Sequence, residues 1–176
     1  MEFSLQPRLE NDFLILEPLQ KEDFEALYKV ASEKEVWAQH PNPDRYKIEV
    51  FQNFFEGAIK SGGAFKIYDK KSGELAGSSR FYDYNEADSS ILIGYTFYGT
   101  KFWGTGLNHK AKRMMMDYIF QYVDKVIFHI GAENLRSQIS ISRLGAEKID
   151  EQLVEYFGES PKLNFIYQIK KENYQK

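Results

Sequence analysis

The sequence contains no cysteine. This absence excludes disulfide bonds, thiol catalysis and cysteine-ligated zinc, and it leaves the redox compartment open. No apolar run approaches the length of a membrane span, and no signal peptide opens the chain. Neither sign of charge dominates, because 23 Lys and Arg stand against 26 Asp and Glu, so nothing favours binding to nucleic acid or to a membrane surface. We therefore expect a cytoplasmic protein.

The three histidines give no indication of a metal. His40, His109 and His129 show no metal-ligand spacing, so we predict that they are structural or incidental and that the protein has no metal site. Aromatic residues, by contrast, are abundant, with 12 Tyr and 14 Phe. They indicate a sheet-rich core in which some rings line a groove. A length of 176 residues suits a single domain, 1–176, with one substantial core.

The hydrophobic periodicity and the turn residues predict a series of strands and helices. In chain order we expect a strand at 13–16, helices at 21–32 and 48–59 on either side of a proline-bearing loop at 36–46, strands at 64–68, 74–84 and 90–98, a helix from 107, a strand at 126–130, a helix at 135–144, and strands at 148–156 and 162–169. The predicted fold class is an α/β mixture, in which an antiparallel meander is followed by a crossover helix.

A glycine-bearing loop separates the strand at 90–98 from the helix that follows it. Gly104 and Gly106 lie in this loop, between Lys101 and Asn108. The first amides of a helix lack partners and the helix dipole is positive at that end, so such a junction suits an anion. We expect a ligand that carries a pyrophosphate. The alternative is a glycine turn that lets the helix pack closely on the strand.

Two familiar phosphate-binding loops are excluded here. A P-loop requires lysine and then Ser or Thr after its second glycine, where this chain has Leu107 and Asn108. A dinucleotide-binding fingerprint requires a third glycine where His109 stands, and it belongs near the first strand of a parallel unit. The pyrophosphate ligand is therefore of another kind.

Three stretches give the chain a resemblance to a known family. They are Gly77-Ser-Ser-Arg-Phe81, Ile93-Gly94-Tyr95-Thr96-Phe97 continued by Phe102-Trp103-Gly104-Thr105-Gly106-Leu107-Asn108, and Asn134-Leu-Arg-Ser137 followed by Arg143-Leu-Gly145. Together with the order of elements, they make the chain similar to the GNAT superfamily of acyl-CoA-dependent N-acyltransferases over nearly its whole length. It most resembles the branch of ribosomal-protein amino-terminal (Rim-type) acetyltransferases.

The resemblance implies a mostly antiparallel central sheet flanked by helices, with a splayed strand pair that takes the acyl-CoA. It implies acetyl-CoA as the acyl-donor cosubstrate and a primary amine as the acceptor, either a protein amino terminus or a small molecule. The residues implied to hold coenzyme A are the loop residues Gly104, Thr105, Gly106, Leu107 and Asn108, the strand residues Phe97 and Tyr98, and the helix residues Asn134 and Ser137. The protein is expected to be a monomer or a homodimer.

Two of these residues carry alternatives. Asn134 either bonds the pantetheine arm or is an ordinary helix N-cap. Ser137, one helical turn later, is the candidate catalytic residue, because its hydroxyl can assist the departing thiolate. The alternative for Ser137 is a small residue that lets coenzyme A lie against the helix. Without cysteine or a Ser-His-acid pattern, no covalent acyl-enzyme is expected, and the amine attacks directly.

The acceptor side is predicted from three residues. Trp37 and Tyr46, in the proline-bearing loop, are candidates for the acceptor groove because of where this loop falls in the resembling fold. Arg80 is a charged residue on an apolar strand, and it faces either the groove or the solvent.

Two departures from the family pattern keep alternatives open. The helix residues Lys110, Lys112 and Arg113 either help to hold coenzyme A phosphates or form a solvated helix face. The last strand, at Asn164-Phe165-Ile166-Tyr167, lacks the acidic-aromatic pattern of the family. An acetyltransferase is therefore the predicted function, and a non-catalytic coenzyme A-binding module on the same fold is the alternative.

Overall fold

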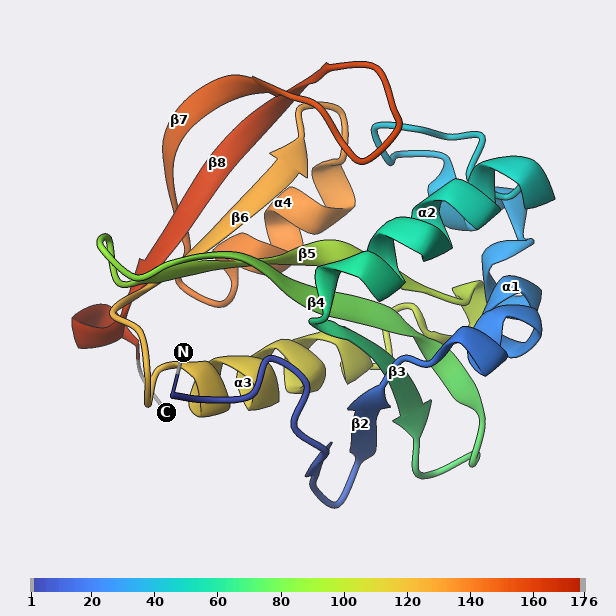
Figure 1. The fold of residues 1–176 in the computed structure, drawn as a ribbon, viewed down its shortest axis with the longest axis horizontal. Helices are drawn as coiled ribbons and strands as arrows, with labels where there is room; N and C mark the ends of the chain where they lie inside the picture. Colours follow the sequence, from blue (N-terminus) through green and yellow to red (C-terminus); the bar gives the residue numbers. More distant parts are fainter. Residues whose placement is uncertain (1, 175–176) are drawn as a thin grey trace.

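The structure, a computed structural model, describes residues 2–174. Within these residues, eight strands form one sheet in the order β1-β2-β3-β4-β5-β6-β8-β7 (Figure 1). The strands are β1 (Leu9–Glu10), β2 (Leu14–Pro18), β3 (Ala64–Asp69), β4 (Leu75–Asn85), β5 (Ser90–Tyr98), β6 (Lys125–Gly131), β7 (Glu147–Val154) and β8 (Lys162–Lys170). The main helices are α1 (Phe24–Ala31), α2 (Ile48–Ser61), α3 (Leu107–Ile119) and α4 (Leu135–Ser142).

The predicted order of elements is confirmed, and the structure adds the short strand β1 before it. The first predicted helix is observed as a 3-10 turn, Lys21–Asp23, that leads into α1. The predicted mostly antiparallel sheet is also confirmed, because every strand pair is antiparallel except β5 with β6. The fold class is a mixed α/β architecture.

Helix α2 shows why the sequence pattern identifies these elements well. Its buried residues Phe51, Phe54, Phe55 and Ala58 recur at the spacing that places side chains on one helix face. The helix is capped by Gly62, which has a φ of 65° in the left-handed region where glycine is favoured. The helix predicted at 48–59 is therefore confirmed, and it ends two residues later, at Ser61.

Two hydrophobic clusters cover the two faces of the sheet. On the face that we call the α3 face, Met115 and Ile119 of α3 pack in one cluster with Phe81 and Ile91 of the sheet. On the opposite face, the α2 face, a second cluster joins the aromatic residues of α1 and α2 to Phe97. Figure 1 shows α2 and α3 on opposite sides of β4 and β5.

Strands β5 and β6 are parallel neighbours only where they begin. Ser90, Ile91 and Leu92 pair with Lys125, Val126 and Ile127, and no later pair is present. Strand β6 instead pairs along its whole length with β8, from Lys125 to Gly131. The later part of β5, residues 93–98, is therefore left without a partner on its β6 side. The predicted splayed strand pair is confirmed.

A β-bulge in β5 accompanies this separation. Ser78 pairs with Phe97 and Arg80 pairs with Gly94, so two residues of β5, Tyr95 and Thr96, stand opposite Ser79 alone. Tyr95 has a φ of 53°. A bulge bends its strand and increases the local twist, so it turns the end of β5 away from β6.

Candidate active site

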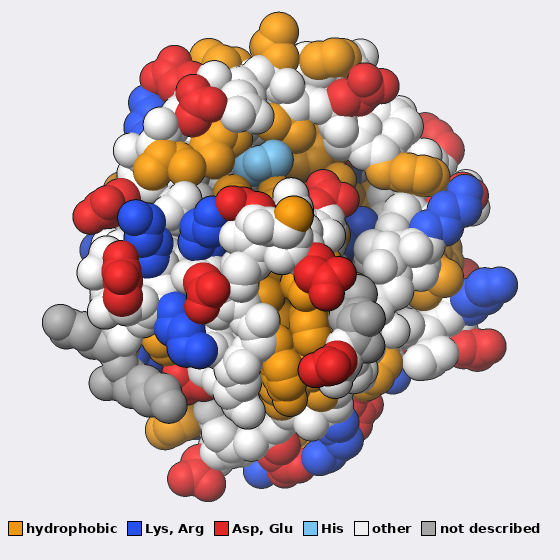
Figure 2. Space-filling model, turned by 60° about the vertical axis from the view of Figure 1, so that its left-hand side comes forward, with side chains coloured by type: hydrophobic (Ala, Val, Ile, Leu, Met, Phe, Trp, Pro, Cys, Tyr) orange, Lys and Arg blue, Asp and Glu red, His pale blue; other side chains and the backbone are white. Residues whose placement is uncertain are grey.

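A cleft of about 720 Å³ opens where β5 and β6 separate. Its wall is built from the bulged part of β5, the glycine loop and first turns of α3, the end of β6, helix α4, and the loop between α1 and α2. We call this cavity the β5–β6 cleft. Of the described residues that line it, none is Asp or Glu, whereas Arg45, Lys112, Arg136 and Arg143 are cationic. The cleft therefore suits an anionic ligand. The outer surface is different, since acidic and basic side chains are interspersed over the face shown in Figure 2.

The glycine loop presents bare backbone to one end of the cleft. Gly104 has a φ of 72° and Gly106, the N-cap of α3, has a φ of 82°. A Cβ at Gly104 would meet nothing within 4 Å, and one at Gly106 would meet only the Lys110 Nζ, at 3.4 Å. Both glycines therefore border open space at the start of a thirteen-residue helix. Such a helix end binds anions through its free amides and its dipole.

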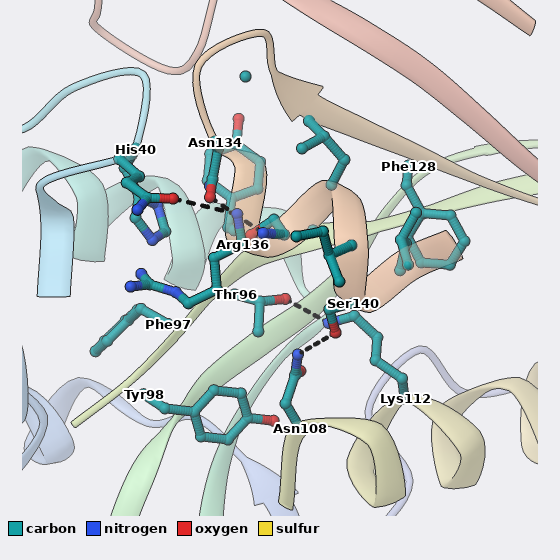
Figure 3. A pocket seen from close by; sticks show the side chains of 18 of the residues that line it. His40, Thr96, Phe97, Tyr98, Asn108, Lys112, Phe128, Asn134, Arg136 and Ser140 are labelled. Carbon is teal, nitrogen blue, oxygen red and sulfur yellow. Dashed lines mark hydrogen bonds between the residues drawn. The ribbon is translucent and has the colours of Figure 1, made fainter. Parts of the chain in front are cut away.

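Two buried side-chain polar atoms beside the loop have no hydrogen-bond partner among residues 2–174. They are the hydroxyl of Tyr98 and the Oδ1 of Asn108, and both residues line the cleft. The other side-chain atom of Asn108, Nδ2, donates a hydrogen bond to the Ser140 Oγ at 3.0 Å, which links α3 to α4. Figure 3 shows this link and the Tyr98 hydroxyl next to Asn108. Buried polar atoms are rarely left unpaired, so this corner of the cleft suits a polar ligand.

The predicted strand residues Phe97 and Tyr98 lie on the unpaired stretch of β5, and both line the cleft. Phe97 sends its ring into the α2-face cluster. The carbonyl of Tyr98 accepts a hydrogen bond from the indole Nε1 of Trp103 at 3.1 Å, so one of its two lone pairs is occupied. The free strand edge suits a ligand with amides, in the manner of an added strand.

Asn134 and Ser137 line the opposite side of the cleft, at the beginning of α4. The Oδ1 of Asn134 accepts a hydrogen bond from the Ser137 amide at 3.2 Å, and Asn134 is the N-cap of α4. The capping alternative is thus confirmed. It does not exclude a second role, because the Asn134 side chain retains its Nδ2 donor at the cleft wall.

Arg136 is a cleft residue that the sequence analysis did not single out. Its guanidinium lies over the Trp103 ring, 3.7 Å from the ring centre, and so joins α4 to the glycine loop across the cleft. Its backbone amide donates to the Gln39 Oε1 at 3.1 Å. Cation and ring belong to segments that are distant in sequence, so no local pattern predicts this contact.

For Lys112, the predicted alternative of a solvated helix face is wrong. Its side chain is only 5% exposed and lies inside the cleft. Its Nζ donates to the Thr96 Oγ1 at 2.6 Å (Figure 3) and to the Ser79 Oγ at 3.4 Å. Burial lowers the pKa of Lys112 from 10.5 to about 7. The sequence signal that could have indicated this position is the spacing of Asn108 and Lys112, which lie one helical turn apart and so share a helix face.

The three predicted acceptor residues do not line the cleft. Trp37 is fully buried, and its indole donates to the Ala31 carbonyl at 2.7 Å. Tyr46 is half-buried away from the cleft wall. Arg80 does not face solvent, because it is 3% exposed and lies over the Tyr95 ring at 3.6 Å. The proline-bearing loop does reach the cleft, but through Val36, Gln39, His40, Pro41 and Arg45.

All three histidines line the cleft, and the pKa of each is lowered below 6.5, in every case chiefly by burial. The pKa of His40 falls to about 3. At pH 7 the neutral form therefore predominates in all three. Within residues 2–174, no group of His, Asp and Glu side chains could hold a metal ion. None of the helices in the same part of the chain is long and apolar enough to span a bilayer.

Comparison with known proteins identifies the family. Residues 14–147 match the acetyltransferase (GNAT) domain. Since this match covers more than half of the chain, the protein belongs to that family. It is an N-acetyltransferase, and acetyl-CoA is its cosubstrate. The resemblance stated from the sequence is confirmed.

Solved structures show how widely the fold is shared. The GCN5-related N-acetyltransferase from Brucella melitensis matches with a TM-score of 0.79 and 17% identity, over 96% of this chain and 80% of that one. Mycobacterium smegmatis RimJ, in complex with CoA-disulfide, matches with a TM-score of 0.71 and 16% identity, over 94% and 87%. Vibrio cholerae spermidine N-acetyltransferase, in complex with CoA and spermine, matches with a TM-score of 0.70 and 15% identity, over 93% and 99%. At these identities the likeness shows the fold.

The β5–β6 cleft fits coenzyme A on its own chemistry. The open backbone at Gly104 and Gly106 suits a pyrophosphate, and the free edge of β5 suits the two amides of the pantetheine arm. The Tyr98 hydroxyl and the Asn108 Oδ1, which have no partner among the described residues, line the same cleft.

Proposed function

We propose that the protein transfers an acetyl group from acetyl-CoA directly to a primary amine, with both substrates bound together, and that its acceptor is a protein amino terminus. The observation that carries the proposal is the β5–β6 cleft, which separates two parallel strands and has no acidic residue among its described lining. Direct transfer follows because the chain has no cysteine to carry the acyl group.

In this proposal the cofactor-binding residues divide along the cleft. The backbone from Gly104 to Asn108, including Thr105 and Leu107, receives the pyrophosphate at the start of α3. The edge of β5 at Phe97 and Tyr98 receives the pantetheine amides. Asn134 and Ser137 contact the arm from α4. An amide on the free edge of β5 also supplies a donor for the carbonyl oxygen as negative charge develops there.

The choice of acceptor rests on the charge of the wall. A polyamine carries several positive charges, and the described lining offers it Lys112, Arg136 and Arg143 without a carboxylate, while the fourth cation, Arg45, is paired with Glu159. An α-amino group has a pKa near 8, so roughly one-tenth of it is neutral at pH 7, whereas less than about one-thousandth of a lysine amine is neutral. An amino terminus therefore needs little help to lose its proton, which suits a cleft without an acidic base.

Thiol release from acetyl-CoA tests this function. The acceptors are peptides with a free amino terminus, the same peptides with an acetylated amino terminus and one internal lysine, polyamines, and amino sugars. We expect turnover with the first group and at most a small rate with the others. Turnover with polyamines alone would contradict the acceptor assignment, and firm acetyl-CoA binding without any turnover would contradict acetyl transfer to these amines.

Asn134→Ala tests the double role of the N-cap residue. Loss of the cap is expected to cost about 1 kcal/mol of stability. Loss of a hydrogen bond to the pantetheine arm is expected to weaken acetyl-CoA binding by about 1 kcal/mol or more, which is roughly fivefold. Thermal melting and calorimetric titration on the same variant measure both.

Asn11→Ala is the matched control for Asn134→Ala. The Asn11 Oδ1 accepts hydrogen bonds from the amides of Phe13 and Leu14, at 2.8 and 3.0 Å, far along the sheet from the cleft. This control should lose stability and keep its acetyl-CoA affinity. If Asn134→Ala behaves in the same way, Asn134 is a cap alone.

Ser137→Ala tests the candidate catalytic residue. If the hydroxyl bonds the departing thiolate, its loss should lower turnover by about ten- to a hundredfold, as for a hydrogen bond to a charged group, with acetyl-CoA affinity nearly unchanged. Ser140→Ala, on the next turn of α4, is the control, because Ser140 already accepts a hydrogen bond from Asn108. Turnover of Ser137→Ala within about twofold of the parent would show that the residue only leaves room for coenzyme A.

A further inference from the structure

Lys112 is a buried cation without a carboxylate partner in the part of the chain that the structure describes. Its two recorded acceptors, on Thr96 and Ser79, are neutral hydroxyls, which also bond each other at 2.8 Å. An ammonium group has three N–H donors, so one is left over. A buried charge that is not paired is costly, and such a residue is otherwise expected at the surface. Because burying this amine costs free energy of folding, we expect Lys112 to have a function within the cleft.

If coenzyme A binds along β5 as proposed, Lys112 lies near the part of the cleft that receives the thioester. The arm of coenzyme A from pyrophosphate to sulfur has about as many bonds as four residues of extended chain, or about 13 Å at 3.3 Å per residue. Measured from the loop end of β5 at Tyr98, four residues lead to Gly94. The arm starts beyond Tyr98, at the pyrophosphate proposed to bind the glycine loop, so its sulfur falls short of Gly94, in the bulged stretch that holds Tyr95 and Thr96. The Lys112 Nζ donates to the Thr96 Oγ1 in this stretch. Figure 3 shows the Lys112 amine reaching from α3 toward Thr96 and Ser140.

We propose that the ammonium of Lys112 faces the sulfur of coenzyme A and gives its proton to the departing thiolate. As the acceptor amine forms its bond to the carbonyl carbon, the carbon–sulfur bond breaks and its electron pair stays on sulfur. Lys112 Nζ donates one proton to that sulfur and becomes a neutral amine, which solvent reprotonates. The amine nitrogen of the acceptor loses its extra proton to water. This inference rests on the proposed function for the place of coenzyme A along β5.

The surroundings of Lys112 suit this role. The groups that face it are Ser79 from β4, Thr96 from β5, and the Asn108–Ser140 pair between α3 and α4, and all of them are neutral. Tyr98, whose pKa is raised by burial, stays a neutral phenol, and Arg143 lines the same cleft from α4. Burial alone lowers the pKa of Lys112, to about 7, so the residue exchanges its proton near neutral pH. A serine hydroxyl such as that of Ser137 can bond a thiolate but is far too weak an acid to protonate it.

The test measures the thiol of coenzyme A itself, without acetyl group or acceptor. Coenzyme A is bound to the wild-type protein, and its thiolate is followed by ultraviolet absorbance as pH is raised, with desulfo-coenzyme A as the blank. Wild-type Lys112 has a pKa of about 7 and is neutral at the pH at which a thiol ordinarily ionises, so the permanent cation of Lys112→Arg is the probe of proximity. If position 112 faces the sulfur, the pKa of the bound thiol should be lower in Lys112→Arg than in Lys112→Met by about 1 to 3 units.

Matched variants keep the result specific. Lys110→Met removes a cation from the same helix next to the glycine loop, and it should leave the pKa of the bound thiol unchanged. Lys112→Met should fold at least as stably as the parent, because it removes a buried charge, and thermal melting verifies this. A bound thiol that titrates alike in Lys112→Arg and Lys112→Met would overturn the inference. Failure of the wild type to bind coenzyme A would overturn the proposed function, and this inference with it.

Discussion

Gly106→Val is expected to lower the affinity for acetyl-CoA by more than tenfold, or about 1.4 kcal/mol, while the fold persists. Gly106 has a φ of 82°, and a side chain there would project into the open space in which the pyrophosphate is proposed to bind. A β-branched residue in this conformation also strains the turn and moves the first amides of α3. Calorimetric titration with acetyl-CoA measures the loss, and circular dichroism verifies the fold.

Gly62→Val is the matched control for the loop. Gly62 has a φ of 65°, and a Cβ there would meet nothing within 4 Å, so this variant carries a similar backbone strain at the end of α2. It should lose stability and bind acetyl-CoA as well as the parent does. Unchanged affinity in Gly106→Val would remove the glycine loop from the binding site.

Arg45→Met is expected to destabilise the protein by about 3–5 kcal/mol. The Nε and Nη2 of Arg45 donate to the two carboxylate oxygens of Glu159 at 2.8 and 2.7 Å, and the side chains are only 2% and 8% exposed. Removal of the cation leaves the Glu159 carboxylate buried without its partner. At about 2–4 °C per kcal/mol for a chain of this size, the melting temperature should fall by about 6–20 °C.

The double variant Arg45→Met with Glu159→Gln is the control, because it removes both charges together. Replacing a buried ion pair by neutral groups is often close to neutral for stability, so the double variant should recover most of the loss. The pair also ties the loop after β7 to the loop before α2, and both loops supply residues to the cleft wall, Tyr156 and Arg45. A single variant that melts within about 2 °C of the parent would show that the pair contributes little.

Much of the fold follows from local signals in the sequence. The apolar spacing of α2 and the glycine after it set that helix, and β5 was placed at its observed residues, 90–98, from β-branched and aromatic residues. The glycine loop was placed at the start of a helix and predicted to bind an anion, because Gly104 and Gly106 need no partner from elsewhere in the chain. Each of these predictions rests on residues that are close together in sequence.

The predicted acceptor residues show that local sequence patterns do not determine which way a side chain points. Trp37 was predicted to line the acceptor groove because of where its loop falls in the resembling fold, yet its ring packs against Phe97 and Phe54 in the core. Arg80 was predicted to face either the groove or the solvent, but it is buried under the Tyr95 ring of the neighbouring strand. An aromatic or charged residue has no fixed side in the sequence, and its partners, which lie on other elements, decide where it goes.

By itself, then, the sequence determined the order of elements, the family resemblance and the glycine turn at the start of α3, because periodicity, turn residues and capping act over a few residues. Only the tertiary structure decided the cleft. The bulge at Tyr95 arises from the register between β4 and β5, and the parting of β5 from β6 arises because β6 pairs instead with β8. Burial of Lys112 follows from the packing of α3 on the bulged strand. These features depend on contacts between segments far apart in the chain, and solvent exclusion there sets the charge state of the lysine.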